Sequence, residues 1–400
     1  YGIVLPVATR EEVLRLSDTY LFNRNQPDRA LDVLETACLV TREAADAARG
    51  EPEATEAEPV PIQPEDVRES VSRLTRIQVS YLGENRSRLE SLALRLKERV
   101  RGQDEVVDRV AERLLVTKMR LDMNPNRPDG VLLFAGPTGV GKTELARAIA
   151  DVMTGSDTHF LKLDMGNYKD PEAVSLLMGQ DRGRNPEVEP EPSILTRFAR
   201  EHPFGVLVLD EVEKAHPRVL HLFLSILDDG TFRDRLGNLT HFSFCTVIMT
   251  TNLGYGRKYH WAGLPPQDMT DEDRKLVQVA GAEGFIEKVL PPEFMGRIDA
   301  VFQFRPLEPA ILSDLVRTRL ECMSRTLGIR IVLPPDQVLE IAKRAQGTGL
   351  GARALDRLIE QQVGVPVARM KLRGELPEGL AEIQVSLPPW GGTDLVPGEA

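Results

Sequence analysis

Cysteine, aromatic residues and long apolar runs are all scarce in this sequence of 400 residues. The three cysteines, Cys38, Cys245 and Cys322, are far apart and form no CxxC pair, which argues against a disulfide framework or a zinc site. We expect them to be small core side chains. No apolar run approaches the length that crosses a bilayer, and no signal-peptide pattern is visible, so a cytoplasmic location without a membrane partner is predicted.

An excess of basic charge is also missing. The formal net charge is -11 at pH 7 and the pI is about 5.3, so a polyanion is a poor candidate for the main partner, although a local basic patch stays open. Hydrophobic residues make up 42% of the chain, which is enough for two or three domains. Because the sequence starts at Tyr1 rather than at Met, we expect a piece of a longer protein.

The strongest positive signal is a glycine-rich segment, GPTGVGKT, at residues 136–143. It follows the apolar run 131–134 and precedes a run of helical composition, 144–150, which is the strand, loop and helix order that a phosphate-binding loop requires. Glycines let the backbone curl so that its N–H groups face phosphate oxygens. We expect Lys142 to reach the β and γ phosphates and the Thr143 hydroxyl to ligate Mg²⁺. The residues assigned to the nucleotide are Gly136, Pro137, Thr138, Gly139, Val140, Gly141, Lys142, Thr143 and Glu144.

Two carboxylates follow a second apolar run, Val206 to Leu209. Such a run is typical of a parallel strand buried on both faces, so Asp210 and Glu211 are expected at the carboxyl edge of the sheet, where open α/β sheets bind ligands. We predict that Asp210 holds Mg²⁺ and that Glu211 polarises the attacking water of an NTP hydrolase. The alternative is that the pair only caps the next helix.

The rest of the chain divides into segments of different pattern. We expect a helical segment at 1–50, an acidic proline-rich linker at 51–63, an α/β domain with a parallel sheet between helices at 64–305, a smaller, mostly helical domain with a short sheet at 306–388, and a tail at 389–400. In the first segment, two apolar stripes are expected to face the core, one through Val13, Leu16 and Tyr20 and one through Leu31, Leu34 and Leu39.

With these elements placed, the chain resembles the second ATPase ring of Clp-type AAA+ proteins, the ClpA, ClpB, ClpC and ClpV group. The resemblance covers nearly everything from Tyr1 to about Gln384. It implies an AAA+ P-loop NTPase fold, ATP and Mg²⁺ as cofactors, and specificity for adenine, which the phosphate loop alone does not distinguish from guanine. Residues 16–37 resemble the last helices of a first ring's small domain, so an upstream AAA+ module in the same polypeptide is implied.

Four further motifs have roles that the resemblance implies. In RVRGQDEVV, residues 99–107, Val100 and Arg101 would lie beside the base, and Asn252 matches the first sensor of the γ-phosphate or its water. In PPEFMGRID, Arg297 would be an arginine finger that acts on a neighbouring subunit's nucleotide. In GLGARALDRLI, Arg353 would be the second sensor, which moves with the small domain. Because the finger acts in trans, a homo-hexameric ring is implied.

The chain departs from the family between Gly179 and Ser193. Family members that thread polypeptide carry a glycine-tyrosine pair there, whereas the tyrosine position here is Arg184. Arginine offers charge and hydrogen bonds in place of a large apolar contact, so the grip on a generic polypeptide is expected to be weaker or more selective; alternatively the loop has drifted and faces solvent. A second pore loop contributes Phe232 and Arg235 as predicted substrate contacts.

A ClpP-like peptidase is not expected as a partner, because the nearest match to the docking tripeptide, residues 262–264, lacks a bulky apolar first residue. The leading interpretation is an ATP-driven ring that remodels, unfolds or disassembles a protein substrate, directly or through an adaptor. One alternative, which Arg184 supports, is a regulatory or scaffold ATPase that switches conformation without threading. The third is a nucleic-acid motor or loader, in which a basic channel would come from Arg182, Arg184, Arg233 and Arg235. The acidic net charge disfavours that third interpretation.

Overall fold

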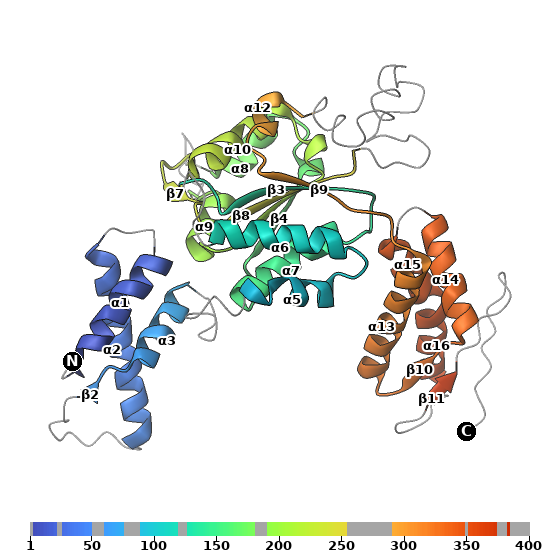
Figure 1. Ribbon diagram of the computed structural model, residues 1–400, viewed down its shortest axis with the longest axis horizontal. Helices are drawn as coiled ribbons and strands as arrows, with labels where there is room; N and C mark the ends of the chain where they lie inside the picture. Colours follow the sequence, from blue (N-terminus) through green and yellow to red (C-terminus); the bar gives the residue numbers. More distant parts are fainter. Residues whose placement is uncertain are drawn as a thin grey trace.

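The computed structural model describes residues 3–21, 26–49, 60–75, 89–118, 126–180, 190–253, 290–348, 351–373 and 382–384. A helical unit at the amino-terminal end, a central α/β domain and a helical carboxyl-terminal domain follow one another along the longest axis of the molecule (Figure 1). Within the described ranges, no helix combines the length and the apolar character needed to cross a membrane.

The amino-terminal unit contains three helices and a two-stranded parallel sheet. Its elements are β1 (Ile3–Val4), α1 (Val7–Tyr20), α2 (Asp28–Arg49), β2 (Val60–Pro61) and α3 (Pro64–Thr75). The predicted stripe of α1 is confirmed, because Val13, Leu16 and Tyr20 are buried. The stripe predicted for α2 is wrong for two of its three residues. Leu31 and Leu39 are 50% and 48% exposed, Leu34 is partly buried against this core, and the buried face contains residues with the helical spacing 33, 37 and 40.

The domain boundary predicted at residue 64 is also wrong. Val67 and Val71 of α3 are fully buried in the core that α1 and α2 form, and the strand β2 lies inside the segment predicted as linker. The helical unit therefore extends to Thr75. Its contact with the central domain includes Phe204, whose ring centroid lies 5.3 Å from that of Tyr20. An apolar stripe reveals that a helix has a buried face but not which core receives it.

The central domain is built on one sheet of five parallel strands in the spatial order β4-β5-β8-β3-β9. The strands are β3 (Gly130–Ala135), β4 (Phe160–Asp164), β5 (Val206–Asp210), β8 (Thr246–Thr251) and β9 (Ala300–Gln303). Strands β3, β5 and β8 are buried along their whole length, as the sequence predicts for strands covered on both faces. The α/β fold class is thereby confirmed.

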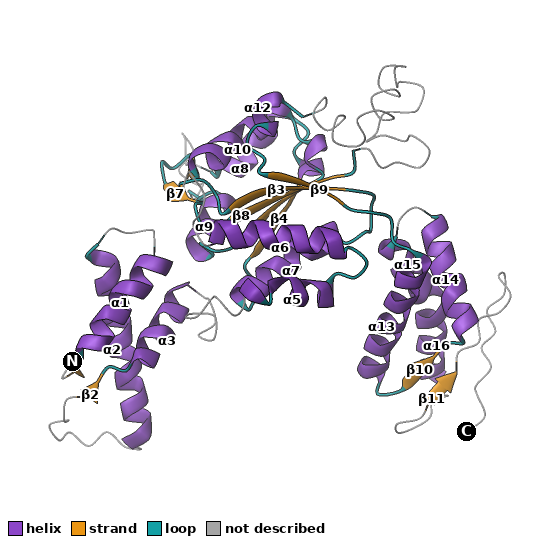
Figure 2. Cartoon of the chain, viewed as in Figure 1, coloured by secondary structure: helices purple, strands orange, loops and turns teal. Residues whose placement is uncertain are grey.

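Helices cover both faces of this sheet (Figure 2). On one face lie α5 (Leu92–Arg99), α6 (Asp104–Lys118) and α7 (Lys142–Thr154). On the other lie α8 (Val174–Met178), α9 (Ile194–Glu201), α10 (Pro217–Asp229) and α12 (Pro292–Met295). Short connections add the 3-10 turns η2 (Met165–Asn167), η3 (Pro171–Ala173) and η4 (Val212–Lys214) and the antiparallel hairpin of β6 (Thr231–Arg233) and β7 (Leu239–His241). Because the strands are parallel, the segments after β3, β5 and β8 meet at one edge of the sheet.

The carboxyl-terminal domain is helical with a short parallel sheet, as predicted. It contains α13 (Pro309–Leu327), β10 (Arg330–Val332), α14 (Pro335–Gly347), α15 (Ala352–Ile359), α16 (Val365–Arg373) and β11 (Glu382–Gln384). A π-helical turn, Glu360–Gly364, separates α15 from α16 just before Pro366, which has no backbone N–H to continue the α-helical ladder. The predicted tail, 389–400, lies outside the described residues.

The cysteines differ in their surroundings. Cys245 is fully buried, as predicted, and burial raises the pKa of its thiol to about 12. Cys38 is partly buried. Cys322 is exposed, so the prediction that all three are core side chains is wrong for this residue of α13.

Candidate nucleotide site

The glycine-rich loop connects β3 to α7 and depends on its glycines. Gly139 and Gly141 have φ of 78° and 103°, a left-handed region that other residues rarely adopt. At Gly136, an added Cβ would lie 2.7 Å from the Cβ of Phe304, so a side chain there would collide with the strand segment beside it. The sequence predicts a curled backbone for this loop, and the structure has it because these three positions require glycine.

A cavity of about 410 Å³ opens beside this loop, between the central domain and the carboxyl-terminal domain. It is lined by Arg99, Val100, Arg101, Thr138, Gly139, Val140, Gly141, Lys142, Thr143, Glu144, Asp210, Glu211, Thr250, Asn252, Leu307, Leu315, Thr318, Arg319, Ala352 and Arg353. Most residues predicted for the nucleotide, in five separate segments of the chain, are thus brought together. Gly136 and Pro137 are not in the lining and take part through their carbonyl groups.

The side chain of Lys142 is folded against its own loop. Its Nζ donates hydrogen bonds to the carbonyl oxygens of Gly136 and Pro137, at 2.5 and 2.8 Å, and to Oδ1 of Asn252 at 2.9 Å. Only 8% of the residue is exposed. This burial lowers the pKa of Lys142 to about 8, although Asp210 and nearby glutamates oppose the change. The ammonium group is therefore held at the floor of the cavity, next to Asn252.

Asp210 lies at the end of β5 with two donors already on its carboxylate. Thr250 donates to its Oδ1 at 2.6 Å, and Nζ of Lys162 lies 2.6 Å from its Oδ2. Burial alone would raise the pKa of Asp210, but these hydrogen bonds outweigh it and the net pKa is lowered. The Thr143 hydroxyl lies 3.5 Å from Oδ1. A carboxylate beside a hydroxyl is a set of hard oxygen donors, which suits Mg²⁺ that keeps most of its other ligands as water and phosphate.

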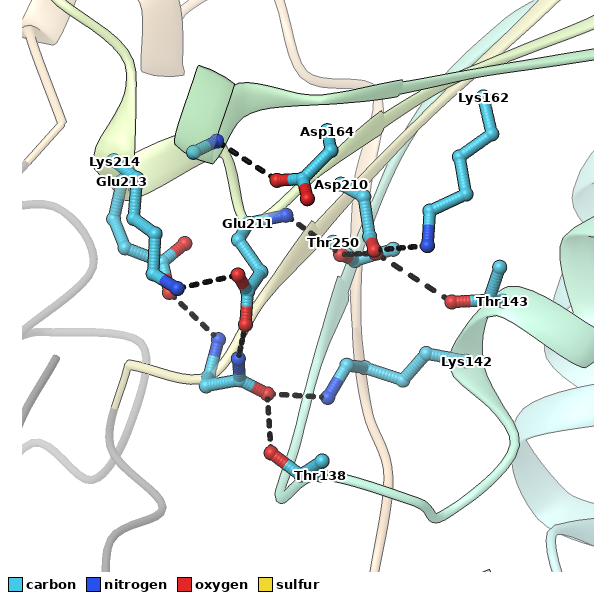
Figure 3. A network of polar contacts seen from close by, with 12 residues as sticks. Thr138, Lys142, Thr143, Lys162, Asp164, Asp210, Glu211, Glu213, Lys214 and Thr250 are labelled. Atoms are coloured by element: carbon cyan, nitrogen blue, oxygen red, sulfur yellow. Dashed lines mark hydrogen bonds and ion pairs between the residues drawn. The ribbon is translucent and has the colours of Figure 1, made fainter. Parts of the chain in front are cut away.

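Glu211 is the only non-glycine residue of the described ranges with positive φ, at 57°. Two side chains hold its carboxylate: Nδ2 of Asn252 donates to Oε1 at 2.9 Å, and Nζ of Lys214 lies 2.5 Å from Oε2 (Figure 3). Its own N–H donates to the hydroxyl of Thr250 at 3.0 Å. The strained backbone and the two donors together aim the carboxylate toward the cavity that the loop lines.

Asn252 is the centre of this polar network. Its side chain accepts from Lys142 and donates to Glu211, and its backbone N–H donates to Oε1 of Glu213 at 3.1 Å. Burial raises the pKa of Glu213, which was not among the predicted site residues. The first sensor position is therefore in direct contact with both the loop lysine and the predicted base.

The arginines predicted for the site differ in position. Arg353, at the start of α15, lines the cavity, and so do Val100, which is buried, and Arg101, which is exposed. Arg297 does not line it. Its Nε lies 2.7 Å from Oδ1 of Asp228 at the end of α10. Within one chain, Arg297 is thus separate from the site that the other residues form.

The predicted pore residues also differ from one another. Phe232 is 2% exposed and belongs to the main core under the sheet, so its assignment as a substrate contact is at odds with its burial. Arg235, in the turn between β6 and β7, is exposed, and its N–H donates to the carbonyl of Met178 at 2.9 Å. Arg182, Arg184 and the tripeptide 262–264 lie outside the described residues.

Several site residues were not predicted. Thr318 and Arg319 lie one helical turn after Leu315 on α13, and all three line the cavity together with Leu307 and Ala352. Their spacing predicts one helix face but not what the face contacts. Three further residues, Lys162, Thr250 and Lys214, carry no functional signal in their local sequence. They contact Asp210 or Glu211 only because the fold brings neighbouring strands and turns together.

Two family models match the chain. Residues 127–301 match the AAA domain (Cdc48 subfamily), and residues 307–385 match the C-terminal, D2-small domain, of ClpB protein. Together they cover the central domain from β3 onward and the carboxyl-terminal domain.

Curated relatives agree with these matches. The chaperone protein ClpB of Lactiplantibacillus plantarum is 35% identical over 322 residues, which are 79% of this chain and 36% of that protein. The ATP-dependent Clp protease ATP-binding subunit ClpE of Bacillus subtilis is 34% identical over 308 residues, 76% of this chain and 43% of that protein. The chain thus spans less than half the length of these relatives.

Solved structures of yeast Hsp104 have a similar arrangement. The S. cerevisiae Hsp104-ADP complex matches 99% of this chain with a TM-score of 0.75 and 27% sequence identity, over 66% of that chain. A closed state of Hsp104 with ATPyS and FITC casein matches 97% of this chain with a TM-score of 0.72, over 64% of that chain.

Proposed function

Because the chain belongs to the Clp-type AAA+ ATPases and corresponds to their second ATPase ring, we propose that it binds and hydrolyses ATP and uses the energy to remodel protein substrates. One observation carries the hydrolysis step: Lys142, Asn252 and Glu211 form a continuous chain of contacts across the cavity beside the phosphate loop. A phosphate-binding cation and a water-activating carboxylate are thereby held at fixed separation by one amide.

The proposed roles follow from chemistry at each position. Backbone N–H groups of the loop and the Lys142 ammonium bind the β and γ phosphates. Thr143 and Asp210 would hold Mg²⁺, which neutralises phosphate charge when bound. Glu211 accepts a hydrogen bond from the attacking water and orients it, and Asn252 fixes the direction of that carboxylate. Val100, together with the apolar side chains of Leu307 and Leu315, would contact adenine.

Two arginines would also act on the phosphates, one from the carboxyl-terminal domain and one from a neighbouring subunit. Arg353, on the carboxyl-terminal domain, lies at the cavity and would contact the phosphates as that domain moves. Arg297 lies outside the cavity of its own chain, which is the position expected of a finger that serves the next subunit. This role requires an oligomer, and we propose a homo-hexameric ring, formed by a polypeptide that also contains an upstream AAA+ module.

A protein substrate is proposed on the strength of the relatives. A similar solved structure of Hsp104 contains casein, and the similar curated proteins include chaperone ClpB proteins. With Phe232 in the core, the exposed Arg235 is the substrate contact that we retain from the second pore loop, and Arg184 is the one from the first. Their charge favours a selective grip over a general apolar one.

The alternative of an ATPase that switches without threading rests on Arg184. The experiment that separates the two is the ATPase rate of the purified protein with and without an unfolded, fluorescently labelled protein, in wild type and in Arg184→Tyr. Substrate stimulation and unfolding by wild type support threading. Hydrolysis without substrate engagement until tyrosine is introduced supports the switch. No hydrolysis under either condition would reject both, and salt-dependent binding of DNA or RNA would favour the nucleic-acid alternative.

A further inference from the structure

Two consecutive carbonyl groups of the phosphate loop are bonded to residues outside it. The Gly139 carbonyl accepts a hydrogen bond from the N–H of Ala352, the first residue of α15, at 2.9 Å. The Val140 carbonyl accepts one from Nε2 of Gln103 at 3.3 Å. The first bond links the loop directly to the carboxyl-terminal domain, and the second leads through one side chain to the segment that joins the two domains.

Gln103 connects the loop to the segment that joins the two domains. The residue is 3% exposed, and its amide bonds both backbone groups of Arg305: Nε2 donates to the carbonyl at 2.8 Å, and Oε1 accepts from the N–H at 3.2 Å. Arg305 lies between β9 and α13, where the central domain ends. A buried amide with three backbone partners is a rigid link, because breaking any one bond leaves a buried polar group unpaired.

Gly351 allows α15 to approach the loop closely. An added Cβ would lie 2.6 Å from the carbonyl oxygen of Gly139 and 3.0 Å from its carbon, and these are backbone atoms that have little room to move. The φ of Gly351 is 54°, with ψ of -131°, a combination that side chains disfavour. Alanine at this position would therefore separate the start of α15 from the loop.

The two bonds fix the orientation of two loop amides. A peptide group is planar and trans, so the carbonyl of Gly139 and the N–H of Val140 point in opposite directions, and the same holds for Val140 and Gly141. Gly139 and Gly141 flank these peptides and give them rotational freedom. Holding both carbonyls on these partners therefore keeps the N–H groups of Val140 and Gly141, two residues that line the cavity, pointing away from the partners.

We propose that Gln103 and Gly351 are positioning residues that keep two phosphate-binding amides aligned while the carboxyl-terminal domain is docked on the loop. The inference rests on the proposed nucleotide site and adds a backbone route of communication that does not pass through the guanidinium group of Arg353. By thermodynamic linkage, phosphates that favour the aligned loop also favour the docked domain, and docking favours phosphate binding by the same factor.

The test compares nucleotide affinities of the whole purified protein by isothermal titration calorimetry. Gly351→Ala and Gln103→Met should each weaken ADP binding about tenfold, which corresponds to the loss of one or two intramolecular hydrogen bonds. Adenosine, which has no phosphate, should bind as it does to wild type. The matched control is Gly347→Ala in α14, where an added Cβ meets nothing within 4 Å, and it should change neither affinity.

A second measurement tests whether nucleotide binding in turn stabilises the docking of the carboxyl-terminal domain. Saturating ADP should slow amide hydrogen exchange in residues 351–359 of wild type, because the nucleotide stabilises docking. In Gln103→Met, whose substitution lies outside α15, this slowing should be reduced. A residue with only a structural role would alter exchange equally with and without ADP.

The outcomes separate this inference from the proposed function. If wild type does not bind ADP, the nucleotide site itself is wrong. If wild type binds ADP and both variants bind it with the same affinity, the positioning role is overturned while the site stands. If ADP and adenosine lose affinity to the same extent in the variants, the whole cavity has changed, and the positioning role is again rejected.

Discussion

Lys214 and Glu211 form an ion pair, 2.5 Å from Nζ to Oε2, across a single turn in which Glu211 has left-handed backbone geometry. The other carboxylate oxygen of Glu211 is bonded to Asn252. Each oxygen of the Glu211 carboxylate therefore has its own partner within the chain. The contact with Glu211 raises the pKa of Lys214, so this lysine stays charged in any ordinary buffer.

Lys214→Met should lower kcat about tenfold and leave KM for ATP nearly unchanged, because a carboxylate held by one donor instead of two spends less time in its productive orientation. Lys214→Arg keeps the charge and should restore most of the rate. Steady-state kinetics of the three proteins is the measurement. A rise in KM without a change in kcat would show that Lys214 serves nucleotide binding rather than Glu211.

Glu211→Gln should bind ATP with about the wild-type affinity and lose turnover by a factor on the order of 10² to 10⁴, since the amide cannot accept a proton from water. ATP binding by calorimetry and phosphate release by a coupled assay check the two halves separately. Undiminished turnover would remove Glu211 from the role assigned to it.

Arg297→Ala should lower turnover on the order of 10³-fold with ATP affinity retained, because the guanidinium serves the transition state of another subunit's reaction. Mixing is the decisive measurement. Arg297→Ala subunits combined with Glu211→Gln subunits should recover part of the activity, since interfaces then exist that have both groups intact. Arg317→Ala, which removes an arginine from an exposed ion pair on α13, is the control and should leave turnover near wild type. No recovery in mixed rings would place the action of Arg297 within its own chain.

Lys142→Met should abolish ATP binding and change how stability depends on pH. The pKa of Lys142 is lowered to about 8 in the folded protein, whereas the same group in the unfolded chain has its ordinary pKa of 10.5. Between these values the unfolded state binds more protons, so wild type should gain stability relative to Lys142→Met as pH rises from 8 toward 10.5, by at most about 3 kcal/mol.

The measurement for Lys142 is urea unfolding of the nucleotide-free proteins at several pH values in this range. Below pH 8 the difference between the two proteins should be constant, because Lys142 is then charged in both the folded and the unfolded state. Parallel curves across the whole range would mean that the buried ammonium keeps an ordinary pKa.

The site residues that were placed without the family resemblance stand directly after an apolar strand or within the glycine pattern. The role of Asn252 came from the resemblance, whereas Thr143 and Asp210 could be placed because the carboxyl ends of parallel strands converge on one edge of a sheet. Lys162 could not, since its contact with Asp210 depends on the pairing of β4 with β5. Strand order was not part of the prediction.

The fold was predicted in its layers and less well in its boundaries. The parallel sheet and the helical carboxyl-terminal domain follow from periodicity and strand length. Helix α3 was assigned to the wrong unit because its amphipathic pattern fits either core, and only the contacts of Val67 and Val71 decide between them. Phe232 was assigned to substrate because its segment resembles the family's second pore loop, and that resemblance does not reveal that its side chain belongs to the core.

The unequal burial of the cysteines makes the chain suited to site-directed labelling without prior mutagenesis of the core. Cys245 has no exposed surface and a thiol pKa of about 12, so maleimide reagents at neutral pH should leave it unmodified. Cys322 is exposed on α13, in the carboxyl-terminal domain, and is therefore available to the reagent. Cys38 is partly buried and can be replaced by serine. A fluorophore on Cys322 would thus report the motion of that domain directly, through its distance to a fluorescent nucleotide in the cavity.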